Sequence, residues 1–335
     1  MESKPENSTP TTTTHNKRLR CIVKLGGAAV TCKNDFERID EENLRAIAVQ
    51  LRRAMLLGEG VGMDWSKGEG VEVDRFVDAD EIGDRGVECR EFVVVHGAGS
   101  FGHFQASKSG VHKGGLDLPL VKAGFVATRI SVTSLNLEIV RALAREGIPS
   151  IGMSPFSCGW STTERKIISA DVSAVTDTIN SGFVPVLHGD AVLDHSQGCT
   201  ILSGDLIIRH LANIFRPEYV VFLTDVFGVY DRPPSEPDAI LLREIAVDEE
   251  GSWTVVQPKL PNVKNQVKIT VAAHDTTGGM VTKISEAAAI AKLGIDVYIV
   301  KAATDYAFKA LNGEMLGKIP ADWMGTAIRF SGSQS

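Results

Sequence analysis

The sequence lacks several patterns that would assign it to a known class at once. Its 335 residues contain no GxxxxGK[ST] loop and no HRD or DFG triplet, so the nucleotide sites of P-loop proteins and protein kinases are excluded. Cysteine is scarce, with five residues and no CxxC pair. An odd number of scattered cysteines fits neither a disulfide framework nor a zinc site. It is typical of reduced thiols, and we therefore expect a cytoplasmic protein without a metal-ligating set.

An excess of positive charge and a long apolar run are also missing. The formal net charge is -7, whereas a nucleic-acid binder needs a basic stripe for the phosphates. No apolar run is long enough for a bilayer, and the N-terminus has no apolar signal core, so we expect no membrane insertion. Hydrophobic residues make up 43% of the chain, which excludes a wholly disordered protein.

Two segments have compositions that argue against a packed core. Residues 1–18 are polar and rich in Thr, Ser, Pro and Glu, and we predict a disordered tail there. Glu2 and Glu6 argue against the alternative of a transit peptide, because such peptides contain few acidic residues. The segment 59–89 is rich in glycine and acidic residues without helical or strand periodicity. It is predicted to be a long surface insertion.

The rest of the chain alternates between short apolar runs and longer helical patterns. Strands buried on both faces are predicted at Cys21–Leu25, Phe92–Val95, Val184–Leu187, Val220–Leu223 and Val297–Val300. Helices are predicted at Glu42–Leu57, Val121–Glu146, Asp171–Ser181, Asp205–Phe215 and Met280–Leu293, with Asp171 and Asp205 as N-caps. This alternation predicts an α/β fold with a largely parallel sheet and helices on both faces. Ligands bind beyond the carboxyl ends of such strands, where Gly26, His96, His188 and Thr224 lie.

Four glycine-bearing motifs are the most informative feature of the chain. They are Lys24–Ala28, His96–His103, Ile201–Asp205 and Thr276–Lys283. Glycine lets backbone N–H groups approach an anion closely, and the first and last motifs add a lysine that suits a transferring phosphoryl group. Lys24 stands inside a buried strand, where an unpaired ammonium is costly, so it needs an anion. The order of the motifs indicates a kinase of small molecules.

Each motif also has a second interpretation. Gly97, Gly99 and Gly102 match the GxGxxG pattern of dinucleotide-binding proteins, but the acidic residue expected about 20 residues later is missing. His103 at the mouth of this loop suits a charged hydrogen bond to phosphate, although a lone histidine is more often structural. Asp205 is either only a helix cap or also a carboxylate that holds two lysines in position. The segment 225–230 is either a turn that holds a nucleotide or a surface loop.

Taken in order, KLGG, HGxGxFGH, HGD, SGD, TDVFGVY and TGGMVTK resemble the amino acid kinase superfamily. Within it the chain is most similar to the isopentenyl phosphate kinases, in their plant-like cytosolic form. The resemblance runs from Arg20 to Phe330, and its most specific feature is the Gly102-His103 pair. Ala98 departs from the family pattern, which often has three successive glycines after the first histidine, but its small side chain still leaves room for the backbone to approach a phosphate.

The resemblance implies an αβα sandwich, the amino acid kinase fold, over residues 19–330. An acceptor-binding lobe would span 19–198 and an ATP-binding lobe 199–330. It implies transfer of phosphate from ATP, with Mg²⁺, to isopentenyl phosphate in isoprenoid biosynthesis, and this fold commonly forms homodimers. The short hydrocarbon tail of the acceptor needs an apolar pocket, for which Phe125, Ile130 and Leu137 are candidates.

The resemblance also implies roles for individual residues. The expected catalytic residues are Lys24, Lys33, His103, Asp205 and Lys283. Those expected to bind ATP are Lys24, Gly26, Gly27, Ala28, Ala98, Gly99, Asp225, Gly228, Tyr230, Gly279 and Lys283. Those expected to bind the acceptor are Gly97, Ala98, His103, Gly189, Asp190 and Gly204.

Three other functions remain open from the sequence. A kinase of the same fold can act on another small phosphate, a phosphonate such as fosfomycin, or a carboxylate. A non-catalytic sensor can keep the loops, although Lys24, Asp205 and Lys283 together favour turnover. An NAD-binding oxidoreductase is weakened by the missing acidic residue.

Overall fold

The computed structural model describes residues 19–33, 35–58, 62–64, 89, 91–259 and 279–332. The predicted tail at 1–18, most of the predicted insertion at 59–89, and the start of the last glycine motif lie outside these residues.

A nine-stranded sheet, in the order β13-β12-β15-β14-β9-β1-β2-β6-β3, forms the centre of the fold. Six of its eight neighbouring pairs are parallel; β12 with β13 and β14 with β15 are antiparallel. In chain order the strands are β1 (Cys21–Leu25), β2 (Phe92–His96), β3 (Ser150–Met153), β6 (Val184–His188), β9 (Tyr219–Thr224), β12 (Glu244–Val247), β13 (Trp253–Gln257), β14 (Asp296–Lys301) and β15 (Thr326–Phe330). The predicted, largely parallel sheet is confirmed.

Helices cover both faces of this sheet. They are α1 (Gly27–Val30), α2 (Glu41–Met55), α4 (Gly99–Ser109), α5 (Pro119–Arg145), α6 (Ser173–Asn180), α7 (Gly204–Phe215), α8 (Gly279–Ala291) and α9 (Asp305–Leu311), with a short 3-10 helix η1 at Val111–Lys113. Alternate residues of β1 enter two different core clusters: Val23 packs with α2, α5 and α9, and Ile22 with α6, α7 and α8. Successive side chains of a strand point to opposite faces, so these clusters are the two layers of an αβα sandwich.

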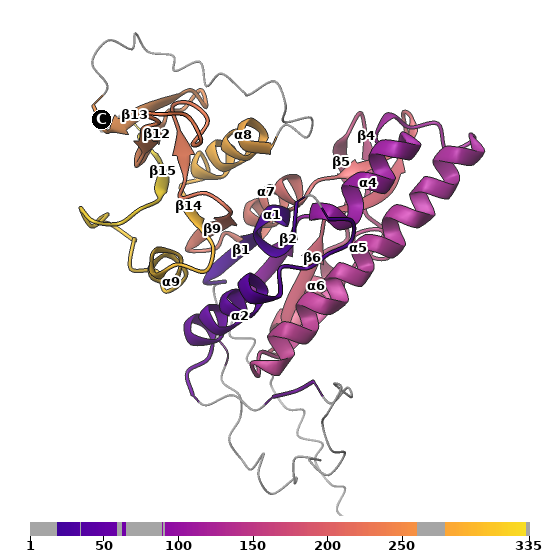
Figure 1. The fold of residues 1–335 in the computed structure, drawn as a ribbon, viewed down its shortest axis with the longest axis horizontal. Coiled ribbons are helices and arrows are strands. Elements are labelled where there is room, and N and C mark those ends of the chain that lie inside the picture. Colours follow the sequence, from indigo (N-terminus) through magenta and orange to yellow (C-terminus); the bar gives the residue numbers. More distant parts are fainter. Residues whose placement is uncertain are drawn as a thin grey trace, which may run out of the picture.

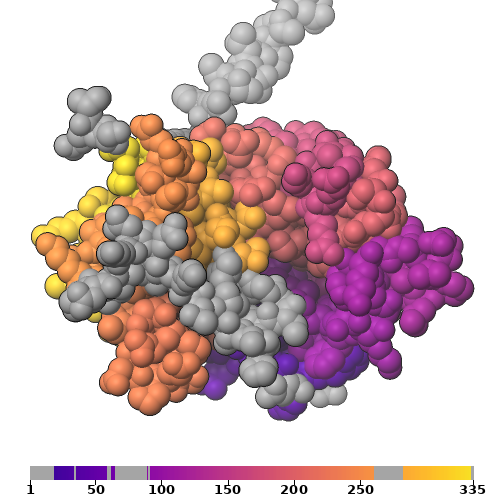
Figure 2. Space-filling view, turned by 90° about the horizontal axis from the view of Figure 1, so that it is seen from above, coloured from indigo at the N-terminus to yellow at the C-terminus, as the bar shows by residue number. Residues whose placement is uncertain are grey.

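Helices α4 and α5 and the C-terminal elements lie on opposite sides of β1 and β2 (Figure 1). The C-terminal group contains β12 to β15, α8 and α9, coloured orange to yellow (Figure 1). Figure 2 shows the same division on the molecular surface, with the first group in purple and magenta. No described helix is both long and apolar enough to cross a membrane.

The five predicted strands and five predicted helices are all present, and no end differs by more than two residues. The predicted cap at Asp205 is wrong. Ser203, not Asp205, caps α7, and its side chain accepts a hydrogen bond from the Leu206 N–H. Asp205 lies in the first turn of α7, so its carboxylate is available for another partner. Val172 occupies the N-cap position of α6, and Asp171 stands one residue before it; its carboxylate nevertheless accepts a hydrogen bond from the Ser173 N–H, the first of the helix, so Asp171 still supplies the capping side chain.

A second, smaller sheet was not expected from the sequence. Its order is β5-β4-β7-β8, from β4 (Ser161–Thr163), β5 (Lys166–Ser169), β7 (Asp190–Asp194) and β8 (Gly198–Leu202). A further hairpin pairs β10 (Val229–Tyr230) with β11 (Leu241–Leu242). These strands are short and several are half exposed, so they lack the continuous apolar run that marks a central strand.

Candidate active site

Lys24 is the most buried cation of the predicted site. It lies on β1 between β9 and β2, and only 6% of its surface is exposed. Its Nζ atom is 2.7 Å from Oδ1 of Asp205, in the first turn of α7. A buried ammonium requires a counter-ion. The expectation that Lys24 needs an anion is therefore confirmed, and in this structure the anion is a carboxylate of the chain itself.

The loops after β1 and β2 meet through their backbones. A Cβ atom on Gly27 would collide with the backbone nitrogen of Gly99. Gly99 has a φ of +53°, a value that L side chains rarely adopt, and a Cβ atom there would collide with the Thr31 side chain. The Thr31 hydroxyl accepts a hydrogen bond from the Ser100 N–H at 3.1 Å. Glycine is therefore required at both positions by close approach, and the two predicted phosphate loops form one surface.

The turn after β6 and the start of α7 adjoin these loops. The Gly189 N–H donates to the His96 carbonyl oxygen at 3.0 Å. A Cβ atom on Gly204 would lie 3.2 Å from both that oxygen and Cε of Lys24. In the first turn of α4 the Ser100 N–H donates to Thr31 and the Phe101 N–H to the Ala98 carbonyl oxygen, and in α7 the Leu206 N–H donates to Ser203. The N–H groups that open each helix, at Gly99 and at Gly204, have no acceptor within their helix, and the helix dipole favours anions there. Gly97, Gly189 and Gly204, all predicted to bind the acceptor, are therefore brought together at one edge of the sheet.

Asp190 is buried, and the surrounding protein occupies its carboxylate. Oδ1 accepts from Nε of Arg129 at 3.3 Å and from the Ala191 N–H at 2.9 Å. Oδ2 accepts from the Ser154 hydroxyl at 2.8 Å and from the Phe156 N–H at 3.3 Å. Because four donors already surround it, the Asp190 side chain anchors the turn, and only its backbone is left for an acceptor.

Arg129 is a site residue that the sequence did not predict. Its guanidinium group joins α5 to Asp190 and to the Ser154 hydroxyl, and it stacks 4.1 Å from the centre of the Phe156 ring. Nothing in the sequence around residue 129 marks this role. The available signal was indirect: an aspartate at the end of a buried strand needs a donor from another element.

His103 lies on α4, one residue after the closely packed Gly102. A Cβ atom on Gly102 would lie 2.7 Å from Ala98 Cβ and 2.8 Å from Val132 Cγ1, so α4 rests directly on α5 at this point. The His103 side chain is exposed instead. It is therefore accessible to a ligand beside the glycine loops, as its predicted role requires.

Two predicted tail-pocket residues are on the wrong face of α5. Ile130 is 64% exposed and Leu137 49% exposed, whereas Thr128, Val132 and Asn136 are buried on the opposite face. With 3.6 residues per turn, the two sets lie about half a turn apart, so Ile130 and Leu137 point away from the glycine loops. Phe125 is buried in a small apolar cluster at the second sheet, where its ring contacts Phe156 edge to face.

The residues predicted to bind nucleotide follow β9. Lys33 Nζ is 2.6 Å from Oδ2 of Asp225, and both side chains are substantially exposed. Gly228 is buried, and a Cβ atom there would collide with the Thr326 hydroxyl, which accepts a hydrogen bond from the Val229 N–H. Gly228 therefore has a packing role.

The remaining nucleotide candidates lie on neighbouring elements. Tyr230 ends β10 and is partly buried, and this burial raises the pKa of its hydroxyl group. Lys301, at the end of β14, was not predicted; its Nζ lies 5.2 Å from the centre of the Phe227 ring. Gly26 and Ala28 lie in the loop and short helix after β1. Gly279 begins α8, and Lys283 is half buried on that helix, which packs on α7.

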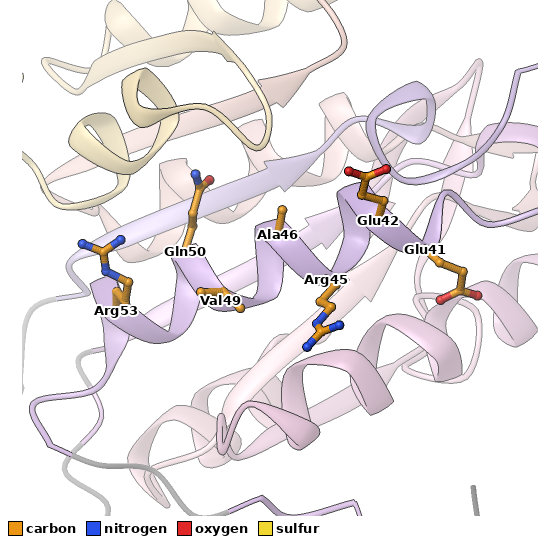
Figure 3. A pocket seen from close by; sticks show the side chains of 7 residues that line it. All are labelled: Glu41, Glu42, Arg45, Ala46, Val49, Gln50 and Arg53. Carbon is orange, nitrogen blue, oxygen red and sulfur yellow. The ribbon is translucent and has the colours of Figure 1, made fainter. Parts of the chain in front are cut away.

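A separate, shallow and open surface region lies along α2. Its lining residues are Glu41, Glu42, Arg45, Ala46, Val49, Gln50 and Arg53. Figure 3 shows that all of these side chains come from this one helix, with Gln50 and Arg45 on different sides of it. This surface contains none of the predicted site residues and mixes both charges, so it is not the substrate site.

Glycine loops, two helix N-termini and several lysines at one edge of a parallel sheet define a kinase of small molecules. Comparison with known proteins agrees. A sequence profile described as the amino acid kinase family matches residues 66–301. An isopentenyl phosphate kinase of Arabidopsis thaliana is 68% identical over 94% of this chain and 97% of its own length. One of Methanothermobacter thermautotrophicus is 34% identical over 84% of this chain and 91% of its own length.

A solved structure agrees as well. An X-ray structure of an isopentenyl phosphate kinase superposes with a TM-score of 0.65 and 29% identity, covering 92% of this chain and 99% of that one. The chain belongs to the amino acid kinase family and, within it, to the isopentenyl phosphate kinases.

Proposed function

We propose that this kinase transfers the γ-phosphoryl group of ATP to isopentenyl phosphate, giving isopentenyl diphosphate and ADP. The observation that carries the proposal is the 68% identity to the Arabidopsis isopentenyl phosphate kinase over almost the whole of both chains. The site agrees with it chemically. An acceptor phosphate is already nucleophilic near neutral pH, so a strong general base is not required. The described site contains no unpaired buried carboxylate of the kind that would act as one, since Asp205 and Asp190 both bind cations.

The main obstacle to the reaction is the repulsion between two polyanions. Backbone N–H groups at the starts of α4 and α7 would hold the phosphates, and His103 would bind the acceptor phosphate from α4. Lys24 would be held in place by Asp205 beside the phosphates. Lys33 and Lys283 would neutralise charge on the equatorial oxygens in the transition state. Asp225 would release Lys33 to the phosphates, because an exposed ion pair is weak.

Magnesium would enter with the nucleotide. The described residues contain no group of three histidine, cysteine or acidic side chains that could hold a metal ion by themselves. Mg²⁺ needs no such group, because it usually keeps several waters and binds substrate phosphates with one or two carboxylates. Asp225 is an exposed carboxylate near the phosphate loops and would be the available protein ligand.

The chain would act as a cytosolic homodimer with two lobes, 19–198 for the acceptor and 199–330 for ATP. Val126, Ile130 and Leu137 form an exposed apolar stripe on the outer face of α5, which would pack on a second copy. All five cysteines are free thiols, in agreement with a reducing compartment. Ile130→Lys should convert the dimer to a monomer in sedimentation analysis, while Ile168→Lys, at another exposed isoleucine, should not.

An acceptor panel with purified enzyme and Mg-ATP tests the reaction. The rates with isopentenyl phosphate and dimethylallyl phosphate should differ by no more than a few tens of fold, because an apolar pocket distinguishes five-carbon isomers poorly. Isopentenol, glutamate, acetylglutamate, uridylate and fosfomycin should give no measurable turnover. The Lys283→Met variant should lose most of its turnover with isopentenyl phosphate. Lys292→Met, just beyond the other end of α8, is the matched control and should keep its turnover. Robust use of a carboxylate or of fosfomycin, with none of isopentenyl phosphate, would contradict the proposal.

A further inference from the structure

Two buried histidines at neighbouring strand ends have no role in the proposed reaction. His96 ends β2 and His188 ends β6, and the two are register partners in the sheet. They are 0% and 1% exposed, and their ring centres are 5.6 Å apart. Each is followed by a glycine of the candidate site, Gly97 or Gly189. Burying two imidazoles beside a phosphate site calls for an explanation, because histidine is rarely buried without polar partners.

The hydrogen bonds of His96 define its protonation state. Nδ1 lies 2.9 Å from the Gly97 carbonyl oxygen, which can only accept, so Nδ1 carries the proton. Nε2 lies 3.1 Å from Nδ2 of Asn136. The same Nδ2 donates to the Val186 carbonyl oxygen at 3.0 Å, which fixes the orientation of the amide. Nε2 must therefore accept, and both contacts are satisfied only by a neutral ring with its proton on Nδ1.

His188 repeats this arrangement one strand away. Its Nδ1 lies 3.0 Å from the Gly189 carbonyl oxygen, so it also donates to the residue that follows it. Burial, with smaller contributions from His188 and Lys24, lowers the pKa of His96 to about 3. Burial also lowers the pKa of His188, although Asp190 opposes the shift. Both rings are therefore neutral near pH 7.

Each of these bonds orients one peptide plane of the site. In a trans peptide the C=O and N–H bonds point in opposite directions. When the Gly97 carbonyl turns toward the His96 ring, the Ala98 N–H turns away from it, and α4 begins at the next residue. The bond from His188 holds the turn at Gly189, where a Cβ atom would lie 3.3 Å from the backbone nitrogen of Gly204 at the start of α7.

We propose that His96 and His188 are positioning residues: as neutral Nδ1–H imidazoles they fix the Gly97 and Gly189 peptides and so direct the N–H groups that bind the phosphates. The inference rests on the proposed phosphoryl transfer. It assigns no proton transfer to either ring.

Asparagine and glutamine variants test it, because each copies one ring nitrogen. In His96→Asn the Nδ2 amide takes the place of Nδ1 and keeps the bond to Gly97; in His96→Gln the amide takes the place of Nε2 and loses that bond. We expect His96→Gln to lower kcat for isopentenyl phosphate by about a hundredfold, because the loop is misplaced. His96→Asn should lower it by only about fivefold. His188→Asn and His188→Gln should show the same ranking.

Melting temperature should rank these variants in the opposite order. Asparagine is shorter and leaves the larger cavity, so each Asn variant should melt below its Gln counterpart. Activity that follows melting temperature, or equal losses for Asn and Gln, would overturn the positioning role. If one pair does not fold, the pair at the other histidine decides the question.

Nitrogen NMR of the intact, ¹⁵N-histidine-labelled enzyme gives a readout that does not depend on turnover. The two buried rings should show the neutral Nδ1–H tautomer near pH 7. A charged ring or an Nε2–H tautomer would overturn the inference. Failure of wild-type enzyme to phosphorylate isopentenyl phosphate would contradict the proposed function instead and leave the tautomer result standing.

Discussion

The interior and the rim of the site each contain a lysine-carboxylate pair. The two pairs have almost the same N···O distance, but they differ in how far their side chains are buried. Lys24 and Asp205 are 2.7 Å apart, with side chains 8% and 12% exposed. Lys33 and Asp225 are 2.6 Å apart, with side chains 64% and 38% exposed. A distance alone therefore says little about what an ion pair does, because the cost of removing a partner depends on burial.

The difference separates two tasks. The interior pair cannot be broken cheaply, so Lys24 stays in place between two glycine loops whether or not a substrate is present. The rim pair is weak and screened by solvent, so Lys33 can exchange a carboxylate for a phosphate during the reaction. Substitutions in the interior should therefore lower the free energy of unfolding more than substitutions at the rim.

Lys24→Met should have the largest effect, because it leaves the Asp205 carboxylate buried without its cation. We expect a loss of about 3–5 kcal/mol in the free energy of unfolding, measured by denaturant titration, together with loss of turnover. The double variant Lys24→Met with Asp205→Leu should regain much of the stability and none of the activity. A single variant as stable as wild type would remove the distinction between interior and rim.

The second-largest effect on the free energy of unfolding should come from low pH. The pKa of His96 falls from 6.5 in the unfolded chain to about 3 in the folded protein, so between these values the unfolded state binds more protons. The free energy of unfolding should therefore decrease as pH falls below 6.5, by roughly 2 kcal/mol at pH 5 for this one ring. His188 acts in the same direction. His96→Asn should flatten the dependence; an unchanged slope would contradict the neutral state of this ring.

Lys33→Met should change stability by less than about 1 kcal/mol, because the pair with Asp225 is exposed. Its effect should fall on kcat, with little change in the melting temperature. Asp225→Asn, which removes the other partner of the pair, should change stability equally little. A stability loss as large as that of Lys24→Met would show that the rim pair is not exchangeable.

His103→Ala should leave the free energy of unfolding within about 0.5 kcal/mol, since the side chain is exposed on α4. Turnover should nevertheless fall by about 10²–10³-fold through loss of a charged hydrogen bond to the acceptor phosphate. His195→Ala is the control, because His195 is an exposed histidine directly after β7 of the second sheet. Near wild-type kinetics for His103→Ala would contradict its assignment to the acceptor.

The sequence alone was enough to predict the central strands, the main helices and the glycine loops at the strand ends. A continuous apolar run such as that of β9 is typical of a strand in the middle of a parallel sheet. The spacing of the glycines indicates where the backbone comes close to another loop or to a ligand. The buried environment of Lys24 followed from its neighbours in β1. These features are local, so they can be read within a window of a few residues.

Tertiary structure alone decided which groups pair across the site. Asp205 binds Lys24 rather than capping its own helix, Arg129 reaches Asp190 from another element, and Asn136 fixes the tautomer of His96. The outward position of Ile130 was likewise decided by which face of α5 packs on α4 and the sheet. Such partners are separated by tens to hundreds of residues in the chain. They meet because parallel strands bring their carboxyl ends to one edge of the sheet and because α5 packs on β6 and β7.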